Sequence, residues 1–207
     1  MERINGKPVD SFIDHPYETR QFICHNLLSL TLRELFDWHF MQTDPNWSNF
    51  YYDEQLKRIN LIDFGACRQY NIHYVARYFK IIECAKNQDK NGIMHWSKAA
   101  GFFTGFESHA MEMAHVDAVL TLGEPFRKVG LYDFSTQDIT NRLKSLISVM
   151  MKDRLKPPPK ESYSLHRKLS GMFLLCYKLK TAVDCNKLYA EIIAPRSQTY
   201  TGFLLNK

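Results

Sequence analysis

The chain has 207 residues, of which 45% are hydrophobic and 14% are aromatic, and its formal net charge is +5. A chain of this length and composition can bury one sizeable core, so we expect a single domain or part of a larger one and exclude a disordered chain. The five cysteines include no CxxC pair, which excludes a cysteine zinc cluster and favours reduced thiols over a disulfide framework. The longest apolar stretch is too short to span a bilayer, and the first ten residues contain no recognisable targeting segment.

The first half of the chain predicts one long helix followed by a small hairpin. Asp14 before Pro16 is typical of a helix start, and an apolar stripe then continues to about Phe40. Two β-type runs follow at 50–52 and 59–62. The polar turn between these runs indicates that they pair as a hairpin.

The second half is predicted to be almost entirely helical. Helical patterns occur at about 73–88, 92–101, 107–121, 137–154, 163–181 and 185–193, with a break at the three prolines 157–159. After Ile192 the helical periodicity is lost. Residues 194–207 are therefore predicted to be a divergent tail.

The hairpin carries the most specific motif in the chain. Asp44 and Asn49 form a D-x-x-x-x-N pattern before its first strand, and Asp63 begins a DFG tripeptide after its second strand. In kinase-like sites this trio places a catalytic carboxylate and two magnesium ligands around nucleotide phosphates. Magnesium prefers hard oxygen ligands and reserves some positions for phosphate, so Asn49 and Asp63 form a sensible partial shell. Asp44 is then expected to orient the attacking hydroxyl or water.

The two residues after Asp63 complete the expected site. Phe64 is predicted to pack behind the metal-binding carboxylate, and Gly65 is predicted to give the backbone freedom to turn. Each part of the motif also has a simpler explanation. A DFG tripeptide occurs often by chance, and Asp44-Pro45 followed by Asn46 is typical of an ordinary turn. The order and separation of the three polar residues, bridged by a predicted hairpin, favour the nucleotide site.

The segments QTDPNWSNF and LIDFGACRQY resemble the UbiB family of atypical protein-kinase-like proteins, also called aarF-domain kinases. The similarity extends to LRELFDWHF, AHVDAVLTLGEPF and LKPPPKESYSLHRKLSGMFLLCYKLK, and so covers roughly residues 1–190. It is strongest to animal mitochondrial members that support coenzyme Q (ubiquinone) biosynthesis. The resemblance implies a mainly α C-terminal lobe of a protein-kinase-like α+β fold, with ATP or ADP and magnesium as cofactors. It also implies coenzyme Q biosynthetic proteins as partners and a location on the matrix side of the inner mitochondrial membrane.

The resemblance also assigns roles to individual residues. Asp44 matches the catalytic-loop Asp, Asn49 the metal ligand of that loop, and Asp63 the metal ligand of DFG, with Gln42 in place of the usual catalytic-loop His. No APE sequence follows DFG, and a helix is predicted by about Ile72, so a peptide substrate has no obvious docking platform. This departure favours ATP hydrolysis coupled to another process, or phosphorylation of a small or lipid-like molecule.

The expected domain organisation is incomplete at its start. The residues before Asp44 contain no Gly-rich or Ala-rich loop and no KxGQ signature, so the N-terminal lobe is expected to be absent. We expect a hinge-like segment at 1–15, a kinase-like lobe at 16–193 and the tail at 194–207, with the catalytic loop at 42–50 and DFG at 63–65. Such a chain would be a truncated, weakly active form of an atypical kinase or ATPase. A non-catalytic, pseudokinase-like scaffold for a coenzyme Q biosynthetic complex is the alternative.

A basic segment in the second half of the chain is the remaining signal. Between Asn141 and Lys180 there are ten basic residues against two acids. Such a segment either meets an anionic lipid surface or forms a solvated helical face. Nucleic acid is not expected as a partner, because no recognition motif accompanies the charge. The basic residues are Arg142, Lys144, Lys152, Arg154, Lys156, Lys160, Arg167, Lys168, Lys178 and Lys180.

Overall fold

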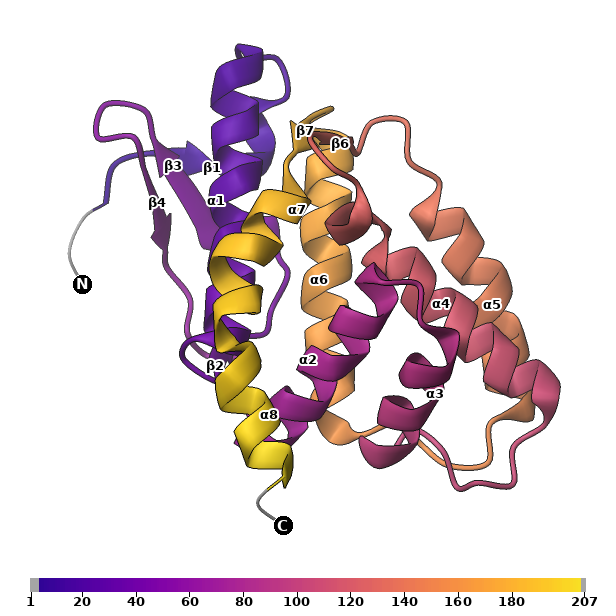
Figure 1. The fold of residues 1–207 in the computed structure, drawn as a ribbon. Helices are drawn as coiled ribbons and strands as arrows, with labels where there is room; N and C mark the ends of the chain where they lie inside the picture. Colours follow the sequence, from indigo (N-terminus) through magenta and orange to yellow (C-terminus); the bar gives the residue numbers. More distant parts are fainter. Residues whose placement is uncertain (1–3, 206–207) are drawn as a thin grey trace. The chain divides into compact units, whose positions relative to one another are not determined.

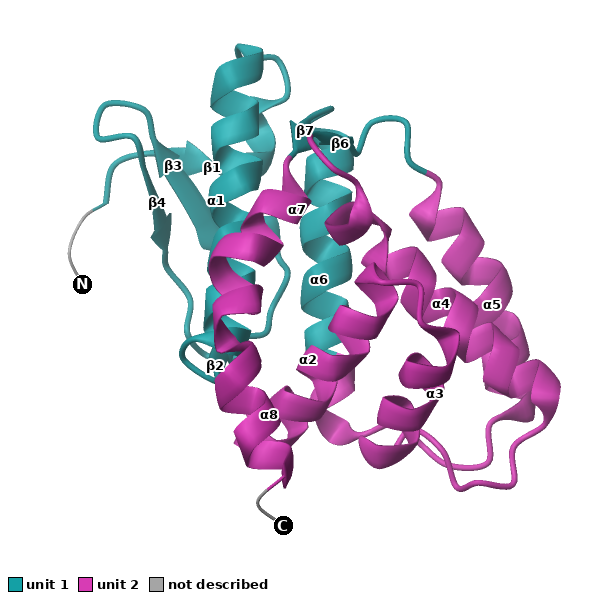
Figure 2. Ribbon diagram, in the orientation of Figure 1, with its two compact units in different colours: residues 1–69, 131–137, 164–183 teal, residues 70–130, 138–163, 184–207 magenta. Residues whose placement is uncertain are grey.

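The computed structural model describes residues 4–205, which form two compact units (Figure 2). Unit 1 combines three segments of the chain, ending at Gln69 and spanning 131–137 and 164–183. Unit 2 contains 70–130, 138–163 and the residues from Asp184 onward. The domain boundaries expected at residues 15 and 193 stay a prediction.

Unit 1 contains all the strands that the described residues form, together with two long helices (Figure 1). The helices are α1 (Tyr17–Phe36) and most of α6 (Lys160–Lys178), and short 3-10 helices occur at Val9–Phe12 and Trp47–Asn49. One antiparallel sheet has the order β1-β3-β4, formed by β1 (Lys7–Pro8), β3 (Phe50–Asp53) and β4 (Arg58–Leu61). Two further antiparallel pairs join β2 (Phe40–Gln42) to β5 (Cys67–Gln69) and β6 (Tyr132–Asp133) to β7 (Ala182–Val183).

The predicted hairpin is formed by β3 and β4, with Phe50 opposite Leu61 and Asp53 opposite Arg58. Its turn is closed by the Asp53 carboxylate, whose Oδ1 accepts hydrogen bonds from the backbone N–H groups of Gln55 and Leu56, both at 3.0 Å. Such local bonds explain why an Asp at this position favours a turn. The hairpin holds the two loops of the motif at its open end.

Unit 2 is helical. It contains α2 (Ile72–Lys86), α3 (Lys90–Ala99), α4 (His109–Arg127), α5 (Ile139–Asp153), α7 (Cys185–Leu188), a π-helix (Tyr189–Ile193), a 3-10 helix (Ala194–Arg196) and α8 (Ser197–Leu205). Side-chain caps fix several starts, since Asn71, Asp89 and Ser108 accept backbone N–H groups at the beginnings of α2, α3 and α4. A core cluster of Cys84, Ala85, Ile93 and Val116 joins these three helices.

The structure confirms the predicted fold class, mainly α with a small β-hairpin, and adds short antiparallel pairs that were not predicted. The predicted helices lie within a few residues of the observed ones. The prediction that the helices end soon after Ile192 is wrong, because Ser197–Leu205 form α8. Within α8, Tyr200 is buried and its ring lies 5.3 Å from the ring of Phe79 in α2. Tyr200 is the one buried side chain of α8, so the sequence shows no apolar stripe along this helix.

Two absences concern the part of the chain that the structure describes. Within residues 4–205, no helix is both long enough and apolar enough to cross a membrane. None of the five cysteines, all of which lie within these residues, forms a disulfide, and four of them are buried.

Candidate functional site

The structure ties together the two loops that carry the motif. The first, the 42–50 loop, runs from the end of β2 to the start of β3, and the second, the 62–66 loop, runs from β4 to β5. Thr43 donates its backbone N–H to the carbonyl oxygen of Ala66 at 3.0 Å, next to the β2–β5 pair. At the other end, Ile62 donates its N–H to the carbonyl oxygen of Asn49 at 3.0 Å. Asp63 is therefore held one residue from a backbone bond to Asn49.

Asp44 and Asn49 contact each other directly. The Asn49 side-chain Nδ2 donates to Asp44 Oδ2 at 2.8 Å, and Asn49 is buried at the end of a 3-10 turn. With the amide nitrogen directed at Asp44, the amide oxygen is the atom of Asn49 that can bind a cation. Asp44 Oδ1 also accepts the backbone N–H of Asn46 at 3.3 Å. The ordinary-turn interpretation and the site interpretation therefore both describe this loop.

The 62–66 loop is a surface segment. Asp63 is exposed, and its Oδ1 accepts the backbone N–H of Gly65 at 2.8 Å. Phe64 is 62% exposed, so the predicted packing of this ring behind Asp63 is wrong for the described residues. The physical reason is that Asp63, Phe64 and Gly65 all lie on the exposed stretch between the two strands, with no apolar surface against the ring. The roles expected of Asp63 and Gly65 stay a prediction.

Helix α6 contacts the 42–50 loop along one face. Lys168, Gly171 and Lys178 are spaced so that they lie on the same side of the helix. Gly171 packs so closely on Pro45 that a Cβ atom would overlap the proline ring. Its carbonyl oxygen accepts the indole N–H of Trp47 at 3.0 Å, and Lys178 Nζ lies 4.9 Å from the Trp47 ring centre.

Lys168 is fully buried beneath this loop. Its Nζ donates to Gln42 Oε1 at 2.7 Å and lies 4.5 Å from the centre of the Phe50 ring. Burial lowers the pKa of the Lys168 amine to about 8, against the opposing attraction of Glu34 and Asp44. Burial likewise raises the pKa of the Glu34 carboxyl, although Lys168 opposes the change. The buried Lys168 amine and the buried Glu34 carboxyl therefore interact near the 42–50 loop, and their attraction offsets part of the desolvation of each group.

Cys67 does not contribute a nucleophile to this group. Burial raises the pKa of its thiol, and the nearby Glu34 carboxylate raises it further. The thiolate is the reactive form of cysteine, and a raised pKa reduces its population at neutral pH.

The oxygen set fits magnesium better than a metal held by protein ligands alone. Within residues 4–205 there is no group of three or more His, Cys, Asp or Glu side chains that could hold a metal ion. The Asn49 amide oxygen and the Asp63 carboxylate supply two hard oxygen ligands on tied loops. Magnesium is commonly bound by one or two protein oxygens together with nucleotide phosphates and water.

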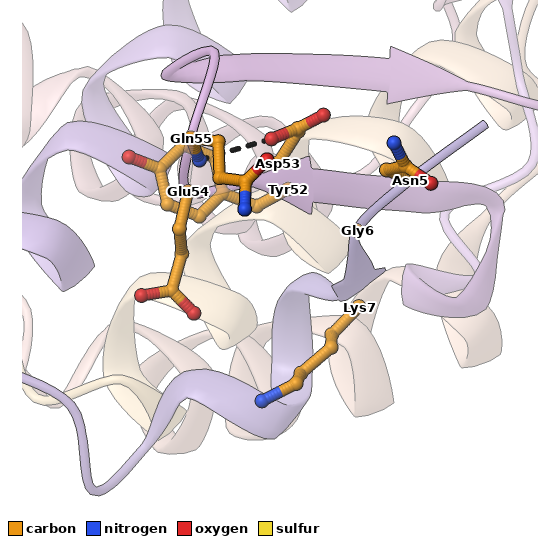
Figure 3. A pocket seen from close by; sticks show the side chains of 7 residues that line it. All are labelled: Asn5, Gly6, Lys7, Tyr52, Asp53, Glu54 and Gln55. Atoms are coloured by element: carbon orange, nitrogen blue, oxygen red, sulfur yellow. Dashed lines mark hydrogen bonds between the residues drawn. The ribbon is translucent and has the colours of Figure 1, made fainter.

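A separate pocket of about 380 Å³ lies in unit 1, away from the motif (Figure 3). It opens between β1 and the turn that follows β3, and none of the predicted site residues lines it. Its most buried acid, Asp53, is used by its own turn, as the bond to Gln55 in Figure 3 shows. The pocket therefore adds nothing to the candidate site. Its lining residues are Asn5, Gly6, Lys7, Tyr52, Asp53, Glu54 and Gln55.

Comparison with known proteins shows where this arrangement recurs. Residues 1–97 match the ABC1 atypical kinase-like domain, a range that contains both loops. The chain is 49% identical over 192 residues to the atypical kinase COQ8B, mitochondrial, of Danio rerio, covering 93% of this chain and 31% of that protein. Residues 1–97 belong to the ABC1 atypical kinase-like family. Yeast COQ8, also named an atypical kinase and mitochondrial, is 43% identical over 196 residues, covering 94% of this chain and 39% of that protein.

These matches to ABC1 atypical kinases concern only part of each relative. The chain spans about a third of the length of the curated relatives it matches. Among solved structures, Rv3197 of Mycobacterium tuberculosis, determined in complex with erythromycin, superposes with a TM-score of 0.71. That match covers 95% of this chain and 49% of the other at 20% identity, so it supports the fold alone. The kinase-like α+β fold expected from the sequence is confirmed.

Sequence reasoning missed Glu34, Lys168 and Gly171. Lys168 could have been found, because it lies three residues after Leu165 and four before Met172, within the apolar stripe of α6. A charged residue at such a position is rarely buried without a partner. Nothing in the sequence around Gly171 indicated its contact with Pro45, which is 126 residues away in the chain.

Proposed function

We propose that this chain binds ATP or ADP with magnesium through the 42–50 and 62–66 loops. The observation that carries the proposal is the bond from Asn49 to Asp44 beside the backbone tie between Asn49 and Ile62. These bonds tie the backbone next to Asp63 to the loop that carries the Asp44 carboxylate and the Asn49 amide. Magnesium bound there would neutralise charge on the nucleotide phosphates.

Each residue of the proposed site then has a distinct role. Asn49 and Asp63 would hold the cation through oxygen atoms, and Gly65 orients Asp63 by donating its N–H to the carboxylate. Asp44 would accept a proton from, or orient, the attacking hydroxyl or water. Its bond to Asn49 fixes the Asp44 carboxylate relative to the metal ligand.

We propose an activity other than peptide phosphorylation. Only residues 66–71 separate Gly65 from α2, which begins at Ile72, and three of them form β5. This stretch is too short to form a platform for an extended peptide. ATP hydrolysis coupled to another process, or phosphorylation of a small or lipid-like molecule, fits this geometry better.

The biological setting is proposed from the relatives. The similar proteins of Danio rerio and yeast are named mitochondrial atypical kinases. We propose that this chain likewise acts in mitochondria, on the matrix side of the inner membrane, and supports coenzyme Q biosynthesis with other proteins of that process. An anionic lipid surface is proposed as a further partner of the basic segment at 141–180.

A nucleotide titration tests the site. Binding of a fluorescent ADP analogue to the chain should require Mg²⁺ and should weaken at least about tenfold in Asp63→Asn, equivalent to about 1.4 kcal/mol. Glu54→Gln is the matched control, because it neutralises an exposed carboxylate at the far end of the same hairpin. Equal affinity in the wild type and Asp63→Asn, with or without Mg²⁺, would contradict the proposal.

The alternative function is a scaffold that binds nucleotide without turnover. Magnesium-dependent ATP hydrolysis by the wild type and Asp44→Asn separates the two functions. A lower rate in Asp44→Asn at retained ADP binding supports the enzyme, whereas equal rates at retained binding support the scaffold.

A further inference from the structure

One buried cation contacts both ends of the 42–50 loop. Lys168 has no exposed surface, and its Nζ donates to the Gln42 side chain at 2.7 Å. The same Nζ lies 4.5 Å from the ring centre of Phe50, the residue after Asn49. A cation over an aromatic face is attracted by the ring, more strongly when both are removed from water. The loop that carries Asp44 and Asn49 is thus fastened at its first and last residues by one side chain.

Glu34 holds the start of this loop from the other side. It lies in α1, is 5% exposed, and accepts the backbone N–H of Gln42 through Oε1 at 3.1 Å. Gln42 is therefore fixed through its main chain by Glu34 and through its side chain by Lys168. Two elements far apart in the sequence, α1 and α6, meet at this one residue.

This network is not arranged for maximal stability. Replacing a buried charge pair with apolar side chains is often neutral or stabilising. Two of its buried atoms, Glu34 Oε2 and Gln42 Nε2, also make no hydrogen bond within the described residues, which is a further cost. When a polar network lowers stability next to a candidate site, the position that it gives to the loop is more important than its contribution to the free energy of unfolding.

We propose that Lys168 is a positioning residue, which holds the 42–50 loop so that Asp44 and Asn49 lie correctly for a magnesium nucleotide. The inference rests on the proposed function of this loop. Lys168 touches neither the nucleotide nor the metal in this proposal; it acts through Gln42 and Phe50. Its positive charge also faces Asp44, and so attracts the carboxylate that the loop must present.

Three variants separate positioning from mere support of the fold. Lys168→Met removes the cation and leaves Glu34 as an uncompensated buried carboxylate, so the thermal midpoint should fall. Adding Glu34→Gln removes that carboxylate as well and should return the midpoint to within about 3 °C of the wild type. Arg167→Met is the matched control, because it removes the neighbouring but exposed cation of the same helix.

Hydrogen exchange of the peptide covering residues 42–50 is the first measurement. We expect exchange at least about tenfold faster in Lys168→Met and also in the double variant, despite its recovered thermal midpoint. Arg167→Met should exchange like the wild type. Wild-type exchange in the double variant would show a purely structural role, and wild-type exchange in Lys168→Met would show no role, so either result overturns the inference.

Steady-state ATP hydrolysis is the second measurement. In the double variant kcat should fall about tenfold or more, because misplacing a reacting group costs the transition state most, and the displaced Asn49 should also raise KM for magnesium ATP. A rise in KM at unchanged kcat would overturn the inference. If the wild type neither binds nor hydrolyses nucleotide, the proposed function fails, and the exchange measurement alone then decides whether Lys168 fixes the loop.

Discussion

At the scale of single residues, the candidate site depends on which atom each side chain presents. Asn49 directs its nitrogen to Asp44 and so offers oxygen to a cation, while Asp63 is oriented by the N–H of Gly65. These orientations need no ligand, since they arise from bonds within the two loops. Lys168 differs, because its side chain is buried away from water, where a positive charge lowers the stability of the fold.

The buried amine of Lys168 predicts a measurable pH dependence of stability. Its pKa is about 8 in the folded state and 10.5 when unperturbed. Between these values the unfolded chain binds more protons than the folded one, so this group's contribution to the free energy of unfolding rises with pH. Relative to Lys168→Met, the wild type should gain about 1–2 kcal/mol between about pH 8 and about pH 9.5.

Urea unfolding of both proteins at the two pH values measures this difference. Tyrosines and cysteines also titrate in this pH range. Their contributions to the free energy of unfolding are common to both proteins and cancel in the difference. A difference that is independent of pH, or that falls as pH rises, would show that the Lys168 amine is not held at a lowered pKa.

At the scale of elements, α6 packs against the 42–50 loop. Gly171 allows the helix to approach Pro45, the residue after Asp44, and its carbonyl receives Trp47. Only a residue without Cβ fits at this contact. The absence of a Cβ at Gly171 therefore permits the close approach of the helix to the loop.

Gly171→Ala should push the loop away from α6. Overpacking of a tight contact costs about 1–3 kcal/mol, and here the displaced residue adjoins Asp44. We expect a lower free energy of unfolding in urea together with weaker magnesium-dependent binding of the ADP analogue.

Gly202→Ala is the control for Gly171→Ala. Gly202 lies in α8, and its added Cβ would meet no atom within 4 Å. It should stabilise the chain by about 0.5–1 kcal/mol through helix propensity. Equal effects of the two substitutions would contradict a close helix–loop contact.

The elements also show which patterns a sequence reveals. The helices with apolar stripes were predicted to within a few residues, and α2 begins at Ile72 as expected. The strands β1, β2, β5, β6 and β7 were missed because each has only two or three residues, too few to show alternation. Helix α8 was missed because Tyr200 is its single fully buried side chain. A helix or strand that is stabilised mainly by a contact with a distant part of the chain shows no periodic pattern in its own sequence.

At the scale of the whole molecule, the basic segment is less uniform than its sequence. Lys168 is fully buried, and Arg142 and Lys178 form ion pairs with Glu124 at 2.6 Å and with Asp10 at 3.0 Å. Lys144 and Lys152 of α5 are exposed, on a helix whose single fully buried residue is Ile139. A lipid surface would therefore meet only the exposed part of the segment, to which α5 contributes Lys144 and Lys152.

Co-sedimentation with vesicles tests the lipid proposal. The chain should bind vesicles of mixed neutral and anionic lipid more strongly than vesicles of neutral lipid alone. This binding should weaken as the salt concentration rises. Lys144→Gln with Lys152→Gln should weaken it by up to roughly 25-fold, since each cation near the surface is worth about 1 kcal/mol.

The control for the lipid experiment removes the same charge elsewhere. Lys57→Gln with Lys90→Gln neutralises two exposed cations outside the basic segment. This variant should bind anionic vesicles nearly as well as the wild type. Equal losses in the two double variants would indicate a general effect of net charge, and absence of anionic preference would leave the segment as a solvated face.

The sequence by itself determined the helices with apolar stripes, the hairpin and the trio Asp44, Asn49 and Asp63, because periodicity and motif spacing are local properties. The tertiary structure decided the rest. It brought Lys168 and Glu34 to Gln42, seated Gly171 on Pro45 and left Phe64 exposed. These contacts join residues as far as 126 positions apart, and their energies depend on burial that arises only once the segments of unit 1 have packed together.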